Sequence, residues 1–382
     1  MPGVSATESP AFPSVDPVGP AGVRLPARHD GLLAAVAAEA ADVDRRGVRR
    51  QTLDGLAAAG LLGSPLDPPL QRELSEVLAG CDASTWFCWV QHQTPMRTLE
   101  GAAAGTLESA PEDLRRELLP GLRSGDLLGA VAFAHVRRPG RPDPVATRVP
   151  GGWRLDGALD WVTSWDIADV VMVMAQGEGA DAGVLVCAYL PAGAAASLTP
   201  GVEPGPPLEL LAMSGTHTRP VTLDGVHVPD SRIGAVVDRR AWLAADAVRS
   251  ADANPAGFGL TRACVAELMI LAERRSDEGM RALAEDLVVE CRAVRTQAYA
   301  LADADGPVAE RLATRARSLD LAVRAATAVV IARAGAAMRS GQAAERRVRE
   351  AMFLLVQAQT QPTRAASLDL LRSRGIGPID VG

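Results

Sequence analysis

The sequence has 382 residues, of which 48% are hydrophobic and 22% are charged, so it holds enough apolar material for a large globular core. Its net charge of −7 argues against a nucleic-acid-binding surface. The longest apolar stretches are short and interrupted by charge, so we expect no membrane span. No lysine occurs, which excludes a Schiff-base lysine and the lysine of a Walker-type phosphate loop.

Residues 1–28 are rich in Pro, Gly, Ser and Ala and lack a positive region ahead of an apolar core. We interpret them as a disordered leader rather than a signal peptide. The five cysteines are scattered and form no C-x-x-C pair, which favours reduced, buried thiols in a cytoplasmic protein. They are Cys81, Cys88, Cys187, Cys264 and Cys291.

Three regions of different composition follow the leader. Residues 29–129 are predicted to be helical, because Leu and Ala recur at three- and four-residue spacing with charges between them. Residues 130–238 change to short β-rich runs separated by Gly, Pro and Asp, typical of an antiparallel sheet or small barrel. Residues 239–382 return to long helical patterns whose Ala-rich faces allow close packing in a bundle. Ligands commonly bind where such domains meet.

Four segments then occur in an informative order. They are DAST at 82–85 followed by His92, GGWRLDGALDWVTSWDIADVVMV at 151–173, MSGTHTRPVTLDGVHVPDSRIG at 213–234, and AERRVREA at 344–351. Together they resemble the acyl-CoA dehydrogenase superfamily over residues 29–374. The resemblance implies an α+β fold with an N-terminal helical domain, a central β-domain forming a small barrel, and a C-terminal four-helix bundle. It also implies a homodimer or homotetramer in which a neighbour completes each flavin site.

The resemblance further implies a flavin, either FAD or FMN. In the family a W-x-T turn lies against the isoalloxazine ring, and this carries over to Trp161 and Thr163. The indole would stack beside the ring and the hydroxyl would hydrogen-bond near N5. Thr216 and Arg275 would assist, Arg275 as a phosphate partner. The alternative is that Trp161 is a core residue of a β-turn. Trp165 lies outside the shared pattern, and we expect it in the core or in a subunit contact.

The position of the family's catalytic base differs in this sequence. Family desaturases carry R-D-A, then six residues, then E-G-T, and the Glu of that triplet removes an α-proton. Here REA at 349–351 is followed at the same spacing by Ala358, which cannot accept a proton. Asp246 and Asp252 are reserve candidates for a relocated base.

The expected contacts to the outer part of the flavin are also changed. The family's R-x-Q-F-G becomes RSDEG at 275–279, and its Q-x-x-G-G-x-G turn becomes IARAGAAM at 331–338. The loop ahead of the β-domain becomes FAHVRRPGRPD, which offers Arg137 and Arg138 as new phosphate partners. A solvated arginine pair is the commoner meaning of such a dipeptide. These changes leave three cases open: a flavin bound as in the family, a weakly bound flavin, and no flavin.

Three functions stay open. The first is a reduced-flavin monooxygenase supplied by a flavin reductase, with His92 or His135 handling protons on a small-molecule substrate. The second is a divergent acyl-CoA or acyl-carrier desaturase or oxidase with a relocated base. The third is a flavin-free member of the fold that acts as a binding protein or in a non-redox step. We favour the first. A structural role is the alternative for His92 and His135, and it is expected for His217 and His227. No paired Cys/His spacing indicates a metal.

Overall fold

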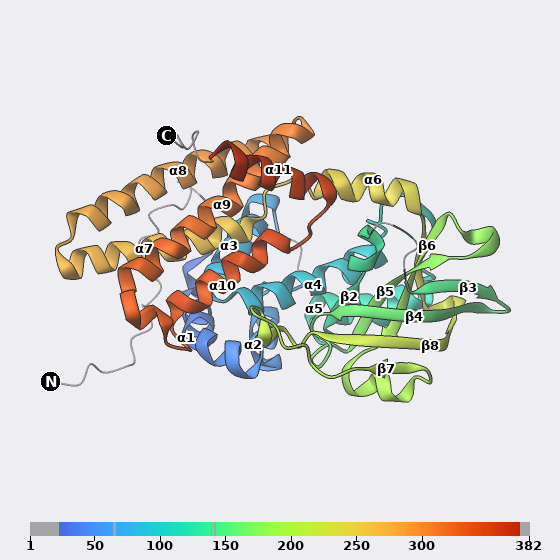
Figure 1. The fold of residues 1–382 in the computed structure, drawn as a ribbon. Coiled ribbons are helices and arrows are strands. Elements are labelled where there is room, and N and C mark those ends of the chain that lie inside the picture. The colour runs from blue at the N-terminus through green and yellow to red at the C-terminus, as the bar shows by residue number, and fades with distance from the viewer. Residues whose placement is uncertain (1–22, 64–65, 139, 141–142, 375–382) are drawn as a thin grey trace, which may run out of the picture. The chain divides into compact units, whose positions relative to one another are not determined.

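The computed structural model describes residues 23–63, 66–138, 140 and 143–374 (Figure 1). The predicted leader, residues 1–28, lies outside the described residues over its first 22 positions.

The chain forms two compact units that alternate along the sequence. The helical unit comprises Met1–Ala27, Pro69–Cys81 and Ala247–Gly382, and the sheet unit comprises Arg28–Pro68 and Asp82–Asp246. A short helical segment from the first third of the sequence therefore packs with the C-terminal helices. The boundaries at 28, 129 and 238, which we drew from the type of secondary structure, stay predictions. Each unit is described separately below.

The sheet unit combines helices with strands. Its helices are α1 (Asp30–Arg46), α2 (Arg50–Ala58), α4 (Ala83–Leu99), α5 (Glu112–Ser124) and most of α6 (Arg239–Arg249). Its strands are β1 (Thr106–Ser109), β2 (Gly129–Ala132), β3 (Val145–Val149), β4 (Gly152–Val162), β5 (Val170–Gly177), β6 (Val184–Pro191), β7 (Val202–Pro204), β8 (Arg219–Pro229) and β9 (Ile233–Asp238). Short 3-10 helices join them: η1 (Ala27–His29), η2 (Ala134–Arg137), η3 (Gly179–Asp181), η4 (Gly193–Leu198), η5 (Ser214–Thr216) and η6 (Asp230–Arg232).

The strands form one mixed sheet. Its order is β1-β9-β6-β5-β3-β4-β8-β7, with β2 paired to β5. The expected antiparallel arrangement is observed at most pairings, but β5 runs parallel to both β2 and β3. Strand β5 is buried along its whole length, which explains why its sequence VVMVMAQG is apolar without alternation.

Two apolar clusters lie on opposite faces of β5. Val171 and Val173 join a cluster that includes Trp165, whereas Val170 and Met172 join a second cluster. This alternation follows from the two-residue period of a strand. The second cluster contains side chains of α4 and α5, so these helices cover that face of the sheet (Figure 1). Trp165, expected in the core or in a subunit contact, is a core residue.

The helical unit is a bundle of long helices (Figure 1). They are α3 (Pro68–Cys81), α7 (Pro255–Arg275), α8 (Glu278–Asp303), α9 (Val308–Arg333), α10 (Ala343–Val356) and α11 (Gln361–Ser373). A short 3-10 helix, η7 (Ala334–Met338), lies between α9 and α10. The side chains of Asn254 and Asp277 cap α7 and α8 by accepting backbone N–H bonds. Helix α3 approaches α7 through glycine: a Cβ on Gly259 would lie 2.0 Å from the carbonyl oxygen of Glu76. Only glycine permits this backbone contact.

Two bundle segments are long and apolar enough to cross a membrane by length and composition alone. They are Pro255–Arg275 and Val308–Met338, and the apolar windows of these segments are 78% and 44% buried inside the structure. The expectation that no apolar run reaches this length is therefore wrong. Core helices of water-soluble proteins pass the same test, so the two segments give only weak support for a membrane. All five cysteines are free and buried.

Candidate functional site

Trp161 differs from the other tryptophans of the sheet unit. The other five are at most 6% exposed, whereas Trp161 is 48% exposed. The cause lies in β4, where the pairing with β8 shifts between Leu159 and Val162. Because of this bulge, Asp160 and Trp161 both face outward and Val162 returns to the core. The alternative that Trp161 is a core residue is thus not what the fold shows. Its indole offers a flat apolar surface on the outside of the unit.

Three threonine hydroxyls form a hydrogen-bonded chain that begins at Thr163, two residues after Trp161. Thr163 Oγ1 is 3.2 Å from Thr218 Oγ1, which is 2.8 Å from Thr216 Oγ1. Thr216 Oγ1 in turn donates to the carbonyl oxygen of Met213 at 2.7 Å. All three side chains are nearly buried. Trp161 and Thr163 on one segment and Thr216 on another are therefore brought together in the sheet unit, as the two motifs predict.

The backbone holds these two segments against each other. The N–H of Ser164 donates to Thr216 O at 2.8 Å, and the N–H of Trp165 donates to His217 O at 3.1 Å. Ser164 and His217 have φ angles of 65° and 52°, in the left-handed region that non-glycine residues rarely adopt. Such conformations persist only where surrounding contacts impose them, and they are common at ligand sites.

His92 lies inside α4 with both ring nitrogens occupied. The N–H of Gly129 donates to Nδ1 at 3.0 Å, and Nε2 lies 2.9 Å from the carbonyl oxygen of Leu122, to which it donates. Burial lowers the pKa of His92 to about 4. The ring is therefore neutral near pH 7, and it joins α4 to the start of β2. This geometry favours the structural alternative for His92 over a role in proton transfer.

His135 lies in η2 and is also buried. Its Nε2 donates to the carbonyl oxygen of Met174 at 2.6 Å, so the proton of the neutral ring is on Nε2. Burial lowers its pKa. The contact anchors η2 to β5 and leaves Nδ1 as the acceptor side of the ring. A proton-handling role for His135 stays a prediction. His217 donates from Nε2 to the carbonyl oxygen of Val48 at 2.8 Å, in line with its expected structural role.

The predicted phosphate partners have different surroundings. Arg275 ends α7 in the helical unit, where it is exposed and donates from Nη1 to the carbonyl oxygen of Ala332 at 2.6 Å. Arg137 forms a bidentate pair with Asp246, with both N···O distances 2.8 Å, and Arg138 pairs with Asp160. The arginine pair therefore has carboxylate partners within the sheet unit. The role of Arg275 stays a prediction.

The position predicted to correspond to the family's base lies between α10 and α11. Ala358 occupies it with a φ of 51°, and its methyl side chain cannot take a proton. Both reserve acids have arginine partners: Asp246 is bound by Arg137, and Asp252 accepts from Arg311 Nε at 2.7 Å.

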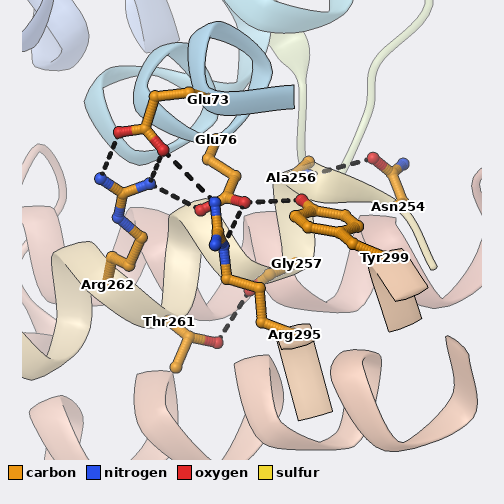
Figure 2. Close-up of polar contacts among 9 residues, drawn as sticks. All are labelled: Glu73, Glu76, Asn254, Ala256, Gly257, Thr261, Arg262, Arg295 and Tyr299. Carbon is orange, nitrogen blue, oxygen red and sulfur yellow. Dashed lines mark hydrogen bonds and ion pairs between the residues drawn. The ribbon is translucent and has the colours of Figure 1, made fainter. Parts of the chain in front are cut away.

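The helical unit contains a buried ionic cluster that was not predicted from the sequence. Glu73 and Glu76 of α3 face Arg262 of α7 and Arg295 and Tyr299 of α8 (Figure 2). Arg262 spans both carboxylates, with contacts of 2.8 Å to Glu73 and 2.6 Å to Glu76. Arg295 Nε and the Tyr299 hydroxyl each donate to Glu76 Oε1 at 2.6 Å. Two positive and two negative charges are thus enclosed by three helices.

Burial dominates the electrostatics of this cluster. It raises the pKa of Glu73 and of Glu76 to about 7, because the loss of water outweighs the attraction of the guanidinium groups. It lowers the pKa of Arg262 to about 10. A sequence signal existed, since Glu73 and Glu76 are three residues apart and share one helix face. That spacing alone also fits a solvated face.

The AERRVREA segment forms a second ionic group in the same unit. Glu267 of α7 binds Arg347 of α10 and also accepts from Arg333 Nε at 2.7 Å. Arg346 pairs with Glu350 at 3.2 Å within α10. The segment therefore joins α10 to α7. Over the described ranges, no group of three or more His, Cys, Asp or Glu side chains could hold a metal ion.

Comparison with known proteins finds the same fold in solved structures. No protein-family model matches the sequence, and no curated protein matches it. Butyryl-CoA dehydrogenase from Megasphaera elsdenii is 16% identical, with a TM-score of 0.73 over 92% of this chain and 100% of that chain. A glutaryl-CoA dehydrogenase from Mycobacterium smegmatis, solved in complex with FADH2, is 16% identical, with a TM-score of 0.72 over 91% and 95%.

A third solved structure comes from a biosynthetic route. FkbI, described as serving biosynthesis of the methoxymalonyl extender unit of a polyketide immunosuppressant, is 20% identical, with a TM-score of 0.68 over 91% of this chain and 99% of that chain. At these identities the likeness concerns the fold. The chain has the acyl-CoA dehydrogenase fold, and the resemblance expected from the four segments is confirmed at that level.

Proposed function

We propose that this protein is a flavin-dependent oxidoreductase acting on a small molecule, and specifically a monooxygenase that uses reduced flavin. The observation that carries the proposal is the indole of Trp161, which a strand bulge turns outward two residues before a chain of threonine hydroxyls begins. A flat redox-active ring needs such an apolar surface together with a hydrogen-bonding group at its reactive edge. The solved complex of the same fold with FADH2 supports FAD as the flavin.

The residues that would hold the flavin divide between two tasks. Trp161 would stack on the ring, and Thr163 would meet its polar edge within the sheet unit. Arg275 would bind phosphate through donors of its guanidinium. When bound, the flavin would supply electrons to dioxygen. The protein's own contribution is to orient the ring and to exclude water with the apolar surface of the indole.

Two features favour oxygenation over dehydrogenation within this class. Ala358 stands where the family's desaturases carry their base, and the reserve acids Asp246 and Asp252 are bound by arginine. Removal of an α-proton needs a basic group within reach of the substrate. Ala358 cannot be that group, and the two reserve acids already accept hydrogen bonds from arginine. A monooxygenase does not need that group. It needs a flavin reductase as partner, and we include that partner and a cytoplasmic location in the proposal.

Assembly of several copies is part of the same proposal. The helical unit exposes large apolar side chains, among them Val289 of α8, Ile331 of α9 and Leu371 of α11. Exposed apolar surface of this kind favours association. We expect a homodimer or homotetramer, and the mass measured by light scattering across a dilution series tests it. A monomer at all concentrations would contradict this part of the proposal.

Flavin titration tests the central claim. FAD and FMN, each oxidised and each reduced under anaerobic conditions, are titrated into the protein and into Trp161→Ala. We expect the variant to lose about five- to 150-fold in flavin affinity, since stacking of an aromatic side chain on a base-like ring contributes about 1–3 kcal/mol. Leu198→Ala, which changes another exposed apolar side chain of the sheet unit, is the control and should bind as the parent does. Equal affinity of Trp161→Ala and the parent would refute the assignment.

A second measurement separates the functions within the class. With a flavin reductase and reduced nicotinamide present, a monooxygenase consumes oxygen in a substrate-dependent manner. Ala358→Glu should leave this activity unchanged, because the proposed reaction needs no base at that position. Acyl-CoA desaturation by Ala358→Glu would show instead that the site has the geometry of a dehydrogenase. A parent protein that binds neither flavin in either redox state would favour a flavin-free binding function.

A further inference from the structure

We propose that the threonine chain makes Thr163 an obligatory hydrogen-bond acceptor, so that the site prefers a reduced flavin over an oxidised one. This inference rests on the proposed function and deepens it, because it concerns the redox state in which the flavin is taken up. Thr216 and Thr218 are positioning residues in this scheme, since they act through Thr163.

The direction of the hydrogen bonds along the threonine hydroxyls is set at the inner end, by Thr216. Thr216 Oγ1 lies 2.7 Å from the carbonyl oxygen of Met213, a distance typical of an O–H···O hydrogen bond. A carbonyl oxygen can only accept, so Thr216 must donate its single proton there. If the hydroxyl turned away, two oxygen atoms with facing lone pairs would remain in contact in a nearly buried place, which is unfavourable.

Each further step follows from the one before. Thr218 Oγ1 lies 2.8 Å from Thr216 Oγ1, whose proton is already used, so Thr218 is the donor. Thr163 Oγ1 lies 3.2 Å from Thr218 Oγ1, whose proton is now also used, so Thr163 donates as well. The protons therefore all point inward, from Thr163 to Thr218 to Thr216 and on to the carbonyl. Such chains reinforce themselves because each bond polarises the next.

At the outer end of the threonine chain, Thr163 Oγ1 has already donated its only proton, so it presents a lone pair to a ligand. Thr163 retains 6% of its surface, and its backbone is fixed two residues beyond the exposed indole of Trp161. Any ligand atom that reaches Thr163 Oγ1 from outside meets an acceptor. Reduced flavin carries N–H groups where oxidised flavin has a bare ring nitrogen with a lone pair. The first can donate to Thr163, whereas the second faces repulsion between two acceptors.

The test replaces Thr218, which accepts the proton of Thr163, by a side chain of nearly the same volume. In Thr218→Val, Thr163 has no partner for its proton and can turn it outward to an oxidised flavin. We measure the dissociation constants of oxidised and of anaerobically reduced flavin and take their ratio. Relative to the parent, the preference for reduced flavin should fall about three- to tenfold, the effect of one hydrogen bond. The midpoint potential of bound flavin should accordingly fall by about 15–30 mV, since a tenfold change in a two-electron couple is about 30 mV.

Two variants control for indirect effects. Thr218→Ser keeps the hydroxyl and should restore the parental ratio. Thr222→Val lies on β8, which begins directly after Thr218; its side chain is exposed and outside the chain of hydroxyls, and the change should leave the ratio unchanged. Thermal unfolding of all variants shows whether each is folded, so that a lost preference in a folded Thr218→Val protein reports on the hydrogen-bond direction.

The possible outcomes distinguish the inference from the function on which it rests. A parental protein that binds no flavin overturns the proposed function itself. A protein that binds flavin but gives the same ratio for Thr218→Val and the parent overturns the inference and leaves the function standing. A lowered ratio in Thr218→Val that is restored in Thr218→Ser supports both.

Discussion

The helical unit and the sheet unit solve the problem of buried polar groups in different ways. The helical unit encloses Glu73, Glu76, Arg262 and Arg295, in which every charge has an opposite charge in direct contact (Figure 2). The sheet unit encloses a chain of uncharged hydroxyls that begins at Thr163 and ends on a backbone carbonyl.

The difference shows which polar groups are available to a ligand. The paired charges inside the bundle hold three helices in one register. Their hydrogen-bonding groups are used by one another, so few remain for a ligand. Hydroxyls cost less to bury, and a chain of them ends in a group with a definite direction. The sheet unit is therefore where we expect recognition, and the ionic interior of the helical unit serves its assembly.

Breaking the ionic interior should have the largest effect. Arg262→Met removes the partner that spans Glu73 and Glu76 and leaves buried carboxylates under-compensated. We expect a loss of about 3–5 kcal/mol in the free energy of unfolding of the helical unit, measured by chemical denaturation. Arg281→Met, which breaks an exposed pair with Glu278 in the same unit, should cost less than about 1 kcal/mol. Similar small losses in both variants would show that the cluster is open to water.

The two neighbouring tryptophans provide the matching contrast in the sheet unit. Trp165→Ala removes a core side chain and should lower the free energy of unfolding by about 3–5 kcal/mol. Trp161→Ala removes a half-exposed side chain and should cost less than about 1 kcal/mol. Chemical denaturation of both variants tests this pair. A large loss for Trp161→Ala would mean that its indole stabilises the fold rather than serving a ligand.

The ionic interior should also make stability depend on pH. The pKa of Glu76 is about 7 in the folded protein, above its ordinary value of 4.5, so the folded state binds more protons between these pH values. The stabilisation is complete below about pH 4.5 and is lost as the pH rises through about 7. Between pH 5 and 7.5 the parent should lose on the order of 1–3 kcal/mol more than Glu76→Gln does. Parallel stability curves for the two proteins would contradict the raised pKa.

The smallest effect concerns the position of the missing base. Ala358 has a left-handed backbone conformation that glycine adopts without strain, so Ala358→Gly should stabilise the helical unit by about 0.5–1 kcal/mol. Ala351→Gly, a buried helical position in α10, should destabilise it by about 1 kcal/mol or more. Thermal unfolding of both variants is the measurement. The same sign for both would mean that the local backbone at 358 relaxes on substitution.

Much of the architecture follows from patterns in the sequence. The order of helices, strands and helices could be predicted because long helices and short strands leave different periodicities. The mixed direction of the sheet could not, because strands as short as β2 carry no signal of their partner. The packing of α3 with the C-terminal bundle depends on glycine contacts such as that of Gly259 with Glu76, which bring together residues far apart in the sequence.

The candidate site was predictable only in part. The Trp161 and Thr163 pattern pointed to a ligand surface, but the exposure of the indole depends on a bulge that the sequence does not reveal. Thr218 was missed because its contribution arises from contact with Thr163, 55 residues away. His92 was chosen from its place after the DAST segment and from the chemistry of imidazole, and the structure shows backbone groups at both ring nitrogens.

The bulge in β4 has one more consequence. Ligand surface and protein interior are separated there by a single step of register, because Asp160 and Trp161 both face outward before Val162 turns inward. In a strand that alternated strictly after Leu159, the indole would point into the core and Val162 would face outward in its place. At this strand, the capacity to hold a ligand depends on the register as well as on the residue types.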